Sequence, residues 1–240
     1  MTSKVLIVVH QKTSVAGHVG VLLEERGYTL DRRCPMIGHD LPETLDDHAG
    51  VVVFGGPMSA NDEHLDGIRS ELAFMDTVLA SDTPFFGICL GGQLLARALG
   101  ARVYLHDEGN VEVGYTKIHP TELGRPYFQQ SDHFYQWHKE GFDLPDGASL
   151  LATGTRFPNQ AYLHGSNKLG IQFHPEITLE MIRRWTAGAA HRMELPGAQP
   201  KEAHIKGFEM FGERIDRWGR TTLDRLGLGG SRKAIMDAAD

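Results

Sequence analysis

The sequence predicts an α/β protein with an open, mostly parallel sheet and helices on both faces of that sheet. Three short apolar runs, at residues 5–9, 51–54 and 85–88, lead to this prediction. They are rich in Val, Ile and Phe and do not alternate with polar residues, which is typical of strands buried on both faces. Strand and helix patterns alternate through the first half of the chain, as in proteins built from parallel βαβ units.

Apolar residues at helical spacing predict two helices in this half. Between the second and third runs they recur at intervals of three and four, which places them on one face of a helix. They are Leu65, Ile68, Leu72, Met75 and Leu79. Residues 90–99 carry a similar stripe, and Gly100 stands where that helix would end.

The second half of the chain has a different pattern. From about residue 101 to 173, Pro and Gly turns separate short β-type runs, which predicts added strands, some of them antiparallel. After Pro175 the pattern is helical again, with a break at 196–200. We expect one domain over residues 1–195 and a C-terminal helical extension over 196–240 that packs on it, with a frayed end from Gly229. The alternative is that this extension docks on another protein.

Composition excludes several classes of partner. The chain has 24 Lys and Arg against 31 Asp and Glu, a net charge of -7, and it lacks a long basic run, which argues against nucleic acid. No apolar run reaches the length that spans a bilayer, and the first residues do not read as a signal peptide. Only two cysteines occur, as expected in a reducing compartment. We therefore expect a soluble cytoplasmic protein without a membrane partner.

Cys89 is the sharpest candidate for chemistry. It lies in the segment GICLGG at 87–92, where an apolar strand must turn abruptly into a helix. Such an elbow exposes its central side chain at the carboxyl end of the strand, and the following helix offers N–H groups and a positive dipole end to an anion. Both effects favour a thiolate nucleophile. A small buried cysteine at a glycine-rich turn is the alternative for this segment taken alone.

Two further segments supply the groups that a thiol nucleophile needs. His174 directly follows the apolar run 169–173, and Glu176 lies two positions later. An imidazole oriented by a carboxylate can accept the thiol proton and later give a proton to the leaving amine. The turn GGP at 55–57 ends another predicted strand, and its N–H groups could complete an oxyanion hole. All three segments lie at carboxyl ends of predicted strands, where open α/β sheets bind ligands.

Together, GICLGG at 87–92, FHPE at 173–176 and GGP at 55–57 resemble the signatures of class I glutamine amidotransferases. Their order and spacing match that family from about residue 4 to 190, and they resemble most the amidotransferase domain of GMP synthase. The resemblance implies a flavodoxin-like fold and cleavage of the side-chain amide of glutamine through a γ-glutamyl thioester on Cys89. The products would be glutamate and ammonia, and a separate synthase or acceptor protein is an expected partner.

The resemblance also implies substrate contacts. It assigns the oxyanion donors to the N–H groups of Gly56 and Leu90, and it gives Gln93 the role of holding the glutamine. The segment around Trp137 and His138 resembles a substrate-contacting stretch of the same family. These five positions are therefore candidate binding residues.

No cofactor and no metal ion are expected. The sequence lacks a glycine-rich phosphate loop, and its 13 histidines do not show the compact spacing of a zinc site. Two other functions stay open. One is a γ-glutamyl peptidase or hydrolase acting on another small γ-glutamyl compound, with the aromatic cluster at 135–137 shaping a wider pocket. The other is a non-catalytic regulatory module with the same fold, against which the intact Cys, His and Glu set argues.

Overall fold

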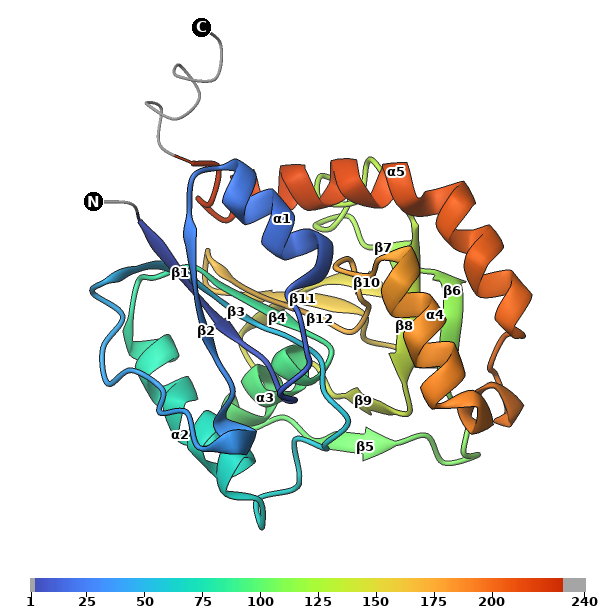
Figure 1. Cartoon of the computed structure of the whole chain (residues 1–240), viewed down its shortest axis with the longest axis horizontal. Coiled ribbons are helices and arrows are strands. Elements are labelled where there is room, and N and C mark those ends of the chain that lie inside the picture. Colours follow the sequence, from blue (N-terminus) through green and yellow to red (C-terminus); the bar gives the residue numbers. More distant parts are fainter. Residues whose placement is uncertain (1–2, 231–240) are drawn as a thin grey trace, which may run out of the picture.

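A mixed eight-stranded sheet forms the centre of the molecule (Figure 1), as seen in a computed structural model that describes residues 3–230. The strand order is β2-β1-β3-β4-β12-β11-β10-β7. Strands β2 through β12 in this order run parallel, and β11, β10 and β7 continue the sheet in antiparallel fashion. The bounds are β1 Lys4–Val8, β2 Thr29–Arg33, β3 His48–Val53, β4 Phe85–Ile88, β7 His119–Pro120, β10 Ala148–Thr153, β11 Ala161–His164 and β12 Lys168–Ile171.

Two small antiparallel ribbons and five α-helices surround this sheet. The ribbons pair β5 with β9 and β6 with β8, and two short 3₁₀ turns complete the elements. The bounds are β5 Val103–Leu105, β6 Glu112–Lys117, β8 His133–His138, β9 Glu140–Phe142, α1 Gly17–Glu25, α2 Asp66–Ala80, α3 Leu90–Ala98, α4 Leu179–Gly188, α5 Lys201–Arg225, η1 Pro35–Ile37 and η2 Ala190–Glu194.

Alternate residues of the central strands face two separate cores. In β1, Val5 and Ile7 pack in the core that α1 and α5 cover, whereas Leu6 and Val8 pack in the core beneath α2 and α3. Burial on both faces explains why these strands read as unbroken apolar runs. The predicted class, an α/β protein with a mostly parallel sheet and added antiparallel strands, is confirmed.

One α-helix and one strand of the first half were not predicted individually, α1 and β2. Strand β2 has the sequence TLDRR and lies at the edge of the sheet, where its side chains are only partly buried. An edge strand does not need apolar residues on both faces, so it lacks the run that revealed its neighbours. Within residues 3–230, no helix combines the length and the apolar character needed to cross a bilayer.

Helix α5 lies across the face of the sheet that also carries α1 (Figure 1). Trp218 on this helix is 1% exposed. Its ring packs 5.0 Å from that of Phe134 and 5.5 Å from that of Phe173, measured between centroids. The helix ends at Arg225, and the frayed end expected from Gly229 lies, beyond residue 230, outside the described residues.

The strand order brings the carboxyl ends of β3, β4 and β12 to one edge of the sheet. Val53 is paired with Gly87, and Ile88 is paired with Ile171, so the three strands end within a few residues of each other in register. The segments that follow them are the glycine turn at 55–57, the elbow at Cys89 and the loop that carries His174. Chain positions far apart in sequence therefore converge at one place.

Replacing Trp218 by Ala should lower the free energy of unfolding by about 3–5 kcal/mol, because it empties a large volume between the aromatic rings of the core. Denaturant unfolding followed by fluorescence or circular dichroism would measure the change. Met210→Ala is the matched control, since Met210 lies on the same helix and is 67% exposed, and it should change stability by less than about 0.5 kcal/mol. Equal effects of the two substitutions would contradict this packing role for α5.

Candidate active site

Cys89 occupies the turn between β4 and α3 in a backbone conformation that is rare for a residue with a side chain. Its φ is 51° and its ψ is -107°, and no other non-glycine residue at 3–230 has a positive φ. Such a conformation costs about 1–3 kcal/mol and persists where the surrounding packing enforces it. The turn directs the thiol out of the sheet edge, and the residue keeps 6% of its surface exposed.

Close backbone packing of the elbow enforces this turn. A Cβ atom added at Gly87 would lie 2.6 Å from the backbone of Gly91, and one at Gly91 would collide with the carbonyl oxygen of Val53 in β3. One added at Gly92 would lie 2.7 Å from the carbonyl oxygen of Ile171 in β12. The start of α3 therefore rests on the backbones of the strands on either side of β4, which only glycine permits.

His174 and Glu176 form a buried pair beside the elbow. The Nδ1 atom of His174 lies 2.8 Å from Oε1 of Glu176, and both residues are 2% exposed. The backbone N–H of His174 donates to the carbonyl oxygen of Tyr135 in β8, and the Trp185 ring packs edge-on against the imidazole at 5.1 Å between centroids. Within residues 3–230, the Nε2 atom of His174 is buried without a hydrogen-bond partner. The imidazole is thus held at one nitrogen and available at the other.

The charge state of His174 follows from its neighbours. Burial alone lowers the pKa of His174, but the negative charges of Glu176 and Cys89 outweigh that effect and raise the pKa to about 10. The imidazolium is therefore the favoured form below about pH 10 and is lost above it. An imidazolium next to a cysteine stabilises the thiolate, which is the nucleophilic form.

The glycine turn after β3 lies next to both Cys89 and His174. A Cβ atom added at Gly55 would lie 2.6 Å from Cε1 of His174 and 3.4 Å from Cβ of Cys89. Neither the N–H of Gly56 nor that of Leu90 donates a hydrogen bond to another of the described residues. Unpaired backbone donors next to a nucleophile are the groups from which an oxyanion hole is built.

A second buried histidine–carboxylate pair contacts the backbone of that turn. His10 lies two residues after the end of β1 and is 1% exposed. Its Nδ1 lies 3.1 Å from the carbonyl oxygen of Gly55, and its Nε2 lies 2.9 Å from Oε2 of Glu71 in α2. Burial lowers the pKa of His10, but the Glu71 carboxylate outweighs burial and raises it. Because both partners are acceptors, the geometry favours a doubly protonated ring that donates to each.

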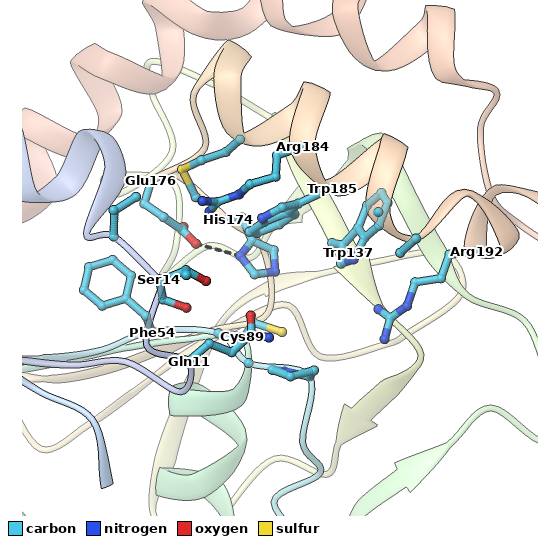
Figure 2. A pocket seen from close by; sticks show the side chains of 18 residues that line it. Gln11, Ser14, Phe54, Cys89, Trp137, His174, Glu176, Arg184, Trp185 and Arg192 are labelled. Atoms are coloured by element: carbon cyan, nitrogen blue, oxygen red, sulfur yellow. Dashed lines mark hydrogen bonds and ion pairs between the residues drawn. The ribbon is translucent and has the colours of Figure 1, made fainter. Parts of the chain in front are cut away.

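A cavity of about 380 Å³ opens over Cys89 (Figure 2). The loop at 11–15, the turn at 54–57 and the aromatic ring of Trp137 form part of its wall. The segment after the histidine loop forms the rest, with Trp185 and Arg184 from α4 and Arg192 from η2. Figure 2 shows His174 and Trp185 between the two arginines, with Cys89 below them. Cys89, His174 and Glu176 all line this cavity.

The expected substrate contacts divide into two groups. Gly56 and Trp137 line the cavity, and Leu90 directly follows Cys89 at the start of α3. Gln93 and His138 do not line it. The structure places these two side chains in a buried layer behind the nucleophile.

Hydrogen bonds hold Gln93 in that layer. Its Nε2 donates to the carbonyl oxygen of Glu140 at 3.0 Å and to Oε1 of Gln172 at 3.2 Å. Gln172 in turn donates from Nε2 to the sulfur of Cys89 at 3.6 Å. Gln93 therefore reaches the nucleophile through Gln172, and a direct contact with substrate would require it to leave these partners.

His138 is bonded on both ring nitrogens. Nδ1 lies 2.9 Å from the carbonyl oxygen of Glu140, and Nε2 lies 3.0 Å from Oε2 of Glu112 in β6. Glu112 also accepts from the side chain of Gln160 at 2.8 Å. This network ties β8 to β6 and β9, so the position of His138 is structural in the present conformation.

Several residues of the site escaped the sequence interpretation. His10 carried a usable signal, because it is a polar residue at the carboxyl end of an apolar strand, as His174 is. Arg184, Trp185 and Arg192 carried none, since their spacing shows only an amphipathic helix and a turn. Groups of three or more His, Cys, Asp or Glu side chains arranged to hold a metal ion do not occur among residues 3–230.

Comparison with known proteins identifies the class to which this fold and site belong. Residues 19–184 match the family described as "Glutamine amidotransferase class-I". The chain therefore belongs to the class I glutamine amidotransferases, as its resemblance predicted.

Relatives of known sequence agree with this placement. A Salmonella typhimurium protein, YfeJ, whose name likens it to glutamine amidotransferases, is 30% identical over 246 residues, which cover 96% of this chain and 100% of YfeJ. The glutamine-hydrolyzing GMP synthase of Yarrowia lipolytica is 35% identical over 136 residues. That match covers 54% of this chain but 24% of the synthase.

Solved structures show the same arrangement along nearly the whole chain. A glutamine amidotransferase from Methylobacillus flagellatus superposes with a TM-score of 0.86 at 26% identity, covering 97% of each chain. One from Thermotoga maritima gives a TM-score of 0.84 at 26% identity, covering 94% of this chain and 98% of that one. The family match ends at residue 184, whereas both structural alignments cover at least 94% of the chain. They therefore include most of the segment after the family match.

Replacing Glu71 by Gln should lower the free energy of unfolding by about 1.5–3 kcal/mol at neutral pH, because it removes a charged acceptor from a buried imidazole. The raised pKa makes this stabilisation largest below about pH 6.5, the ordinary value for histidine, and it declines as pH rises through the raised value. Urea unfolding at several pH values would measure the difference from wild type.

Glu63→Gln is the matched control. Glu63 also pairs with a cation, Arg97, but its side chain is 55% exposed, so the substitution should cost no more than about 1 kcal/mol. A Glu71→Gln difference that is no larger than this, or that grows as pH rises, would contradict the assigned pair.

Proposed function

We propose that the protein cleaves the side-chain amide of glutamine through a γ-glutamyl thioester on Cys89, giving glutamate and ammonia. The observation that carries this proposal is the convergence of a strained cysteine elbow and a buried His174–Glu176 pair on one cavity. Membership of the class I glutamine amidotransferases supports the choice of a γ-amide as the bond that is cleaved. The Yarrowia lipolytica relative is named as glutamine-hydrolyzing, which agrees with the same choice.

In the acylation step, the sulfur of Cys89 attacks the γ-carbonyl carbon and the negative charge moves to the carbonyl oxygen. The N–H groups of Gly56 and Leu90 receive that charge, and the dipole of α3 favours it further. The carbon–nitrogen bond then breaks, and the imidazolium of His174 gives its proton from Nε2 to the departing amine. Ammonia leaves and the γ-glutamyl group stays on sulfur.

In the deacylation step, a water molecule replaces the departed amine. The now neutral His174 accepts a proton from that water as its oxygen attacks the thioester carbonyl. The carbon–sulfur bond breaks, which releases glutamate and restores the thiolate–imidazolium pair. Glu176 holds the ring in one orientation and stabilises its charge throughout, without taking the proton itself.

Ammonia released here could serve a second reaction on another protein. We propose a separate synthase or acceptor protein as its recipient, because the GMP synthase relative joins glutamine hydrolysis to a much longer chain of which this one covers 24%. The cavity of about 380 Å³ over Cys89 has room for the amide substrate.

Replacing Cys89 by Ala should abolish glutamine hydrolysis, by at least about a thousandfold in kcat/KM, because no thioester can form. Cys34→Ala should retain turnover, since Cys34 directly follows β2, is buried in the core and lies outside the cavity. Ammonia and glutamate release would be measured for both. A glutamine-analogue electrophile should add to Cys89, as mass spectrometry of the tryptic peptides would show. Modification of Cys34 with turnover retained in Cys89→Ala would overturn the assignment.

Replacing Glu176 by Gln should shift the alkaline limb of the kcat/KM profile to lower pH. The Glu176 charge helps to raise the pKa of His174 to about 10, so its removal lowers that pKa and the imidazolium is lost earlier as pH rises. His174→Ala should cost more, about 10²–10⁴-fold at neutral pH, because it removes the proton donor itself. Initial rates between pH 6 and about 10.5 would measure both effects. An alkaline limb that stays in place in Glu176→Gln would contradict this role.

A further inference from the structure

Two arginines face the cavity over Cys89 without an acidic partner. Neither Arg184 nor Arg192 makes an ion pair or a side-chain hydrogen bond to another of the residues at 3–230, although both line the cavity. Among the described residues, Glu176 is the only one in the cavity wall that carries a carboxylate, and it is paired with His174. A chain of net charge -7 thus presents positive charge at the mouth of its site. Such a concentration attracts anionic ligands.

A row of aromatic contacts leads from the base to one of these arginines. The His174 ring packs against Trp185, and Trp185 packs against Trp137 at 5.7 Å between centroids. The guanidinium of Arg192 lies 5.9 Å from the centroid of the Trp137 ring. In Figure 2 Arg192 stands on the far side of Trp137 from His174. On the His174 side of the cavity, this row of aromatic rings therefore leads to the positive charge of Arg192.

The proton donor marks where the leaving amine must be. His174 protonates the nitrogen as the amide bond breaks, so any group attached to that nitrogen extends along Trp185 and Trp137 towards Arg192. Ammonia, which leaves from glutamine, has no such group and would use none of these residues. Trp137 is half-buried and Arg192 partly exposed, so both are accessible to a ligand in the cavity.

We propose that the preferred substrate is a γ-glutamyl amino acid or short γ-glutamyl peptide, whose free carboxylate on the leaving side binds Arg192 and whose adjoining atoms pack on Trp137. This inference rests on the proposed Cys89 thioester and changes only the identity of the leaving amine. An arginine binds a carboxylate through paired N–H groups, which gives both energy and orientation.

The chemistry balances with water as the only co-reactant. The sulfur of Cys89 bonds to the γ-carbonyl carbon, the bond from that carbon to the amino nitrogen breaks, and His174 gives its proton to the nitrogen, so a free amino acid or peptide leaves. Water then cleaves the carbon–sulfur bond and yields glutamate. Substrate plus water gives glutamate plus the amino acid or peptide.

The test compares γ-glutamylglycine with γ-glutamylmethylamide, which have the same scissile bond and differ in the carboxylate. Glutamate release should give a kcat/KM about ten- to hundredfold higher for γ-glutamylglycine, the effect of one hydrogen-bonded charge pair. Glutamine should resemble the methylamide. In Arg192→Gln the ratio of the two kcat/KM values should fall towards one.

Arg183→Gln is the matched control, because Arg183 is exposed on α4 next to Arg184 and does not line the cavity. It removes the same charge and should keep the wild-type ratio. A wild-type ratio near one, or an unchanged ratio in Arg192→Gln, would overturn the proposal. A ratio that falls in Arg184→Gln and not in Arg192→Gln would also overturn it, since the carboxylate would then lie on the other side of His174.

Failure of the underlying function would look different. If none of the three compounds releases glutamate and a glutamine-analogue electrophile leaves Cys89 unmodified, the thioester itself is wrong and the leaving-group proposal falls with it. If Cys89 is acylated and glutamine is the best of the three substrates, the thioester holds and only the leaving-group proposal fails. Mass spectrometry of the intact protein distinguishes the two results.

Discussion

The parallel pairing of β3, β4 and β12 is the constraint on which the rest of the site depends. Each strand is buried on both faces and hydrogen-bonded to its neighbours in a register that brings the three carboxyl ends together. The cysteine elbow follows the middle strand, and the glycine turn and the histidine loop follow the outer two. Close contacts of Gly91 with β3 and of Gly92 with β12 then fix the start of α3 between them. A shift of one residue in either pairing would separate the three groups.

Two buried histidine–carboxylate pairs lie next to the glycine turn. His174 with Glu176 faces the thiol, and His10 with Glu71 lies beneath the turn and donates to the carbonyl oxygen of Gly55. Taking such groups out of water is costly unless each charge meets an opposite one. The pairs meet that condition, and they hold the ring and the turn rigid. Rigid donors are more effective at stabilising a developing oxyanion than donors that must reorganise.

The segment after the histidine loop does two things for the site. Helix α4 and the turn η2 place Trp185, Arg184 and Arg192 over the cavity, and α5 returns across the sheet to bury Trp218 against the core. In the proposed reaction, Trp185 and Arg192 of the first set contact the leaving amine beside His174. The second anchors the segment, because a helix whose apolar stripe is buried in the main core cannot move independently of it. The proposed chemistry and the proposed selectivity thus rest on different parts of the chain.

The sequence by itself determined the fold class and the residues that directly follow apolar strands. Cys89, His174 and the glycine turn could be found because burial on both faces produces an unbroken apolar run, and the residue after such a run lies at the ligand-binding edge. The side-chain directions of Gln93 and His138 could not, since hydrogen bonds to Glu140 and Glu112, distant in sequence, turn them into the interior. The positions of Arg184 and Arg192 in the cavity wall could not be predicted either, because the sequence around them shows only an amphipathic helix and a turn. These two guanidinium groups line the cavity because α4 and η2 pack against Trp137 of β8. That contact joins segments far apart in the chain, so no local sequence pattern reveals it.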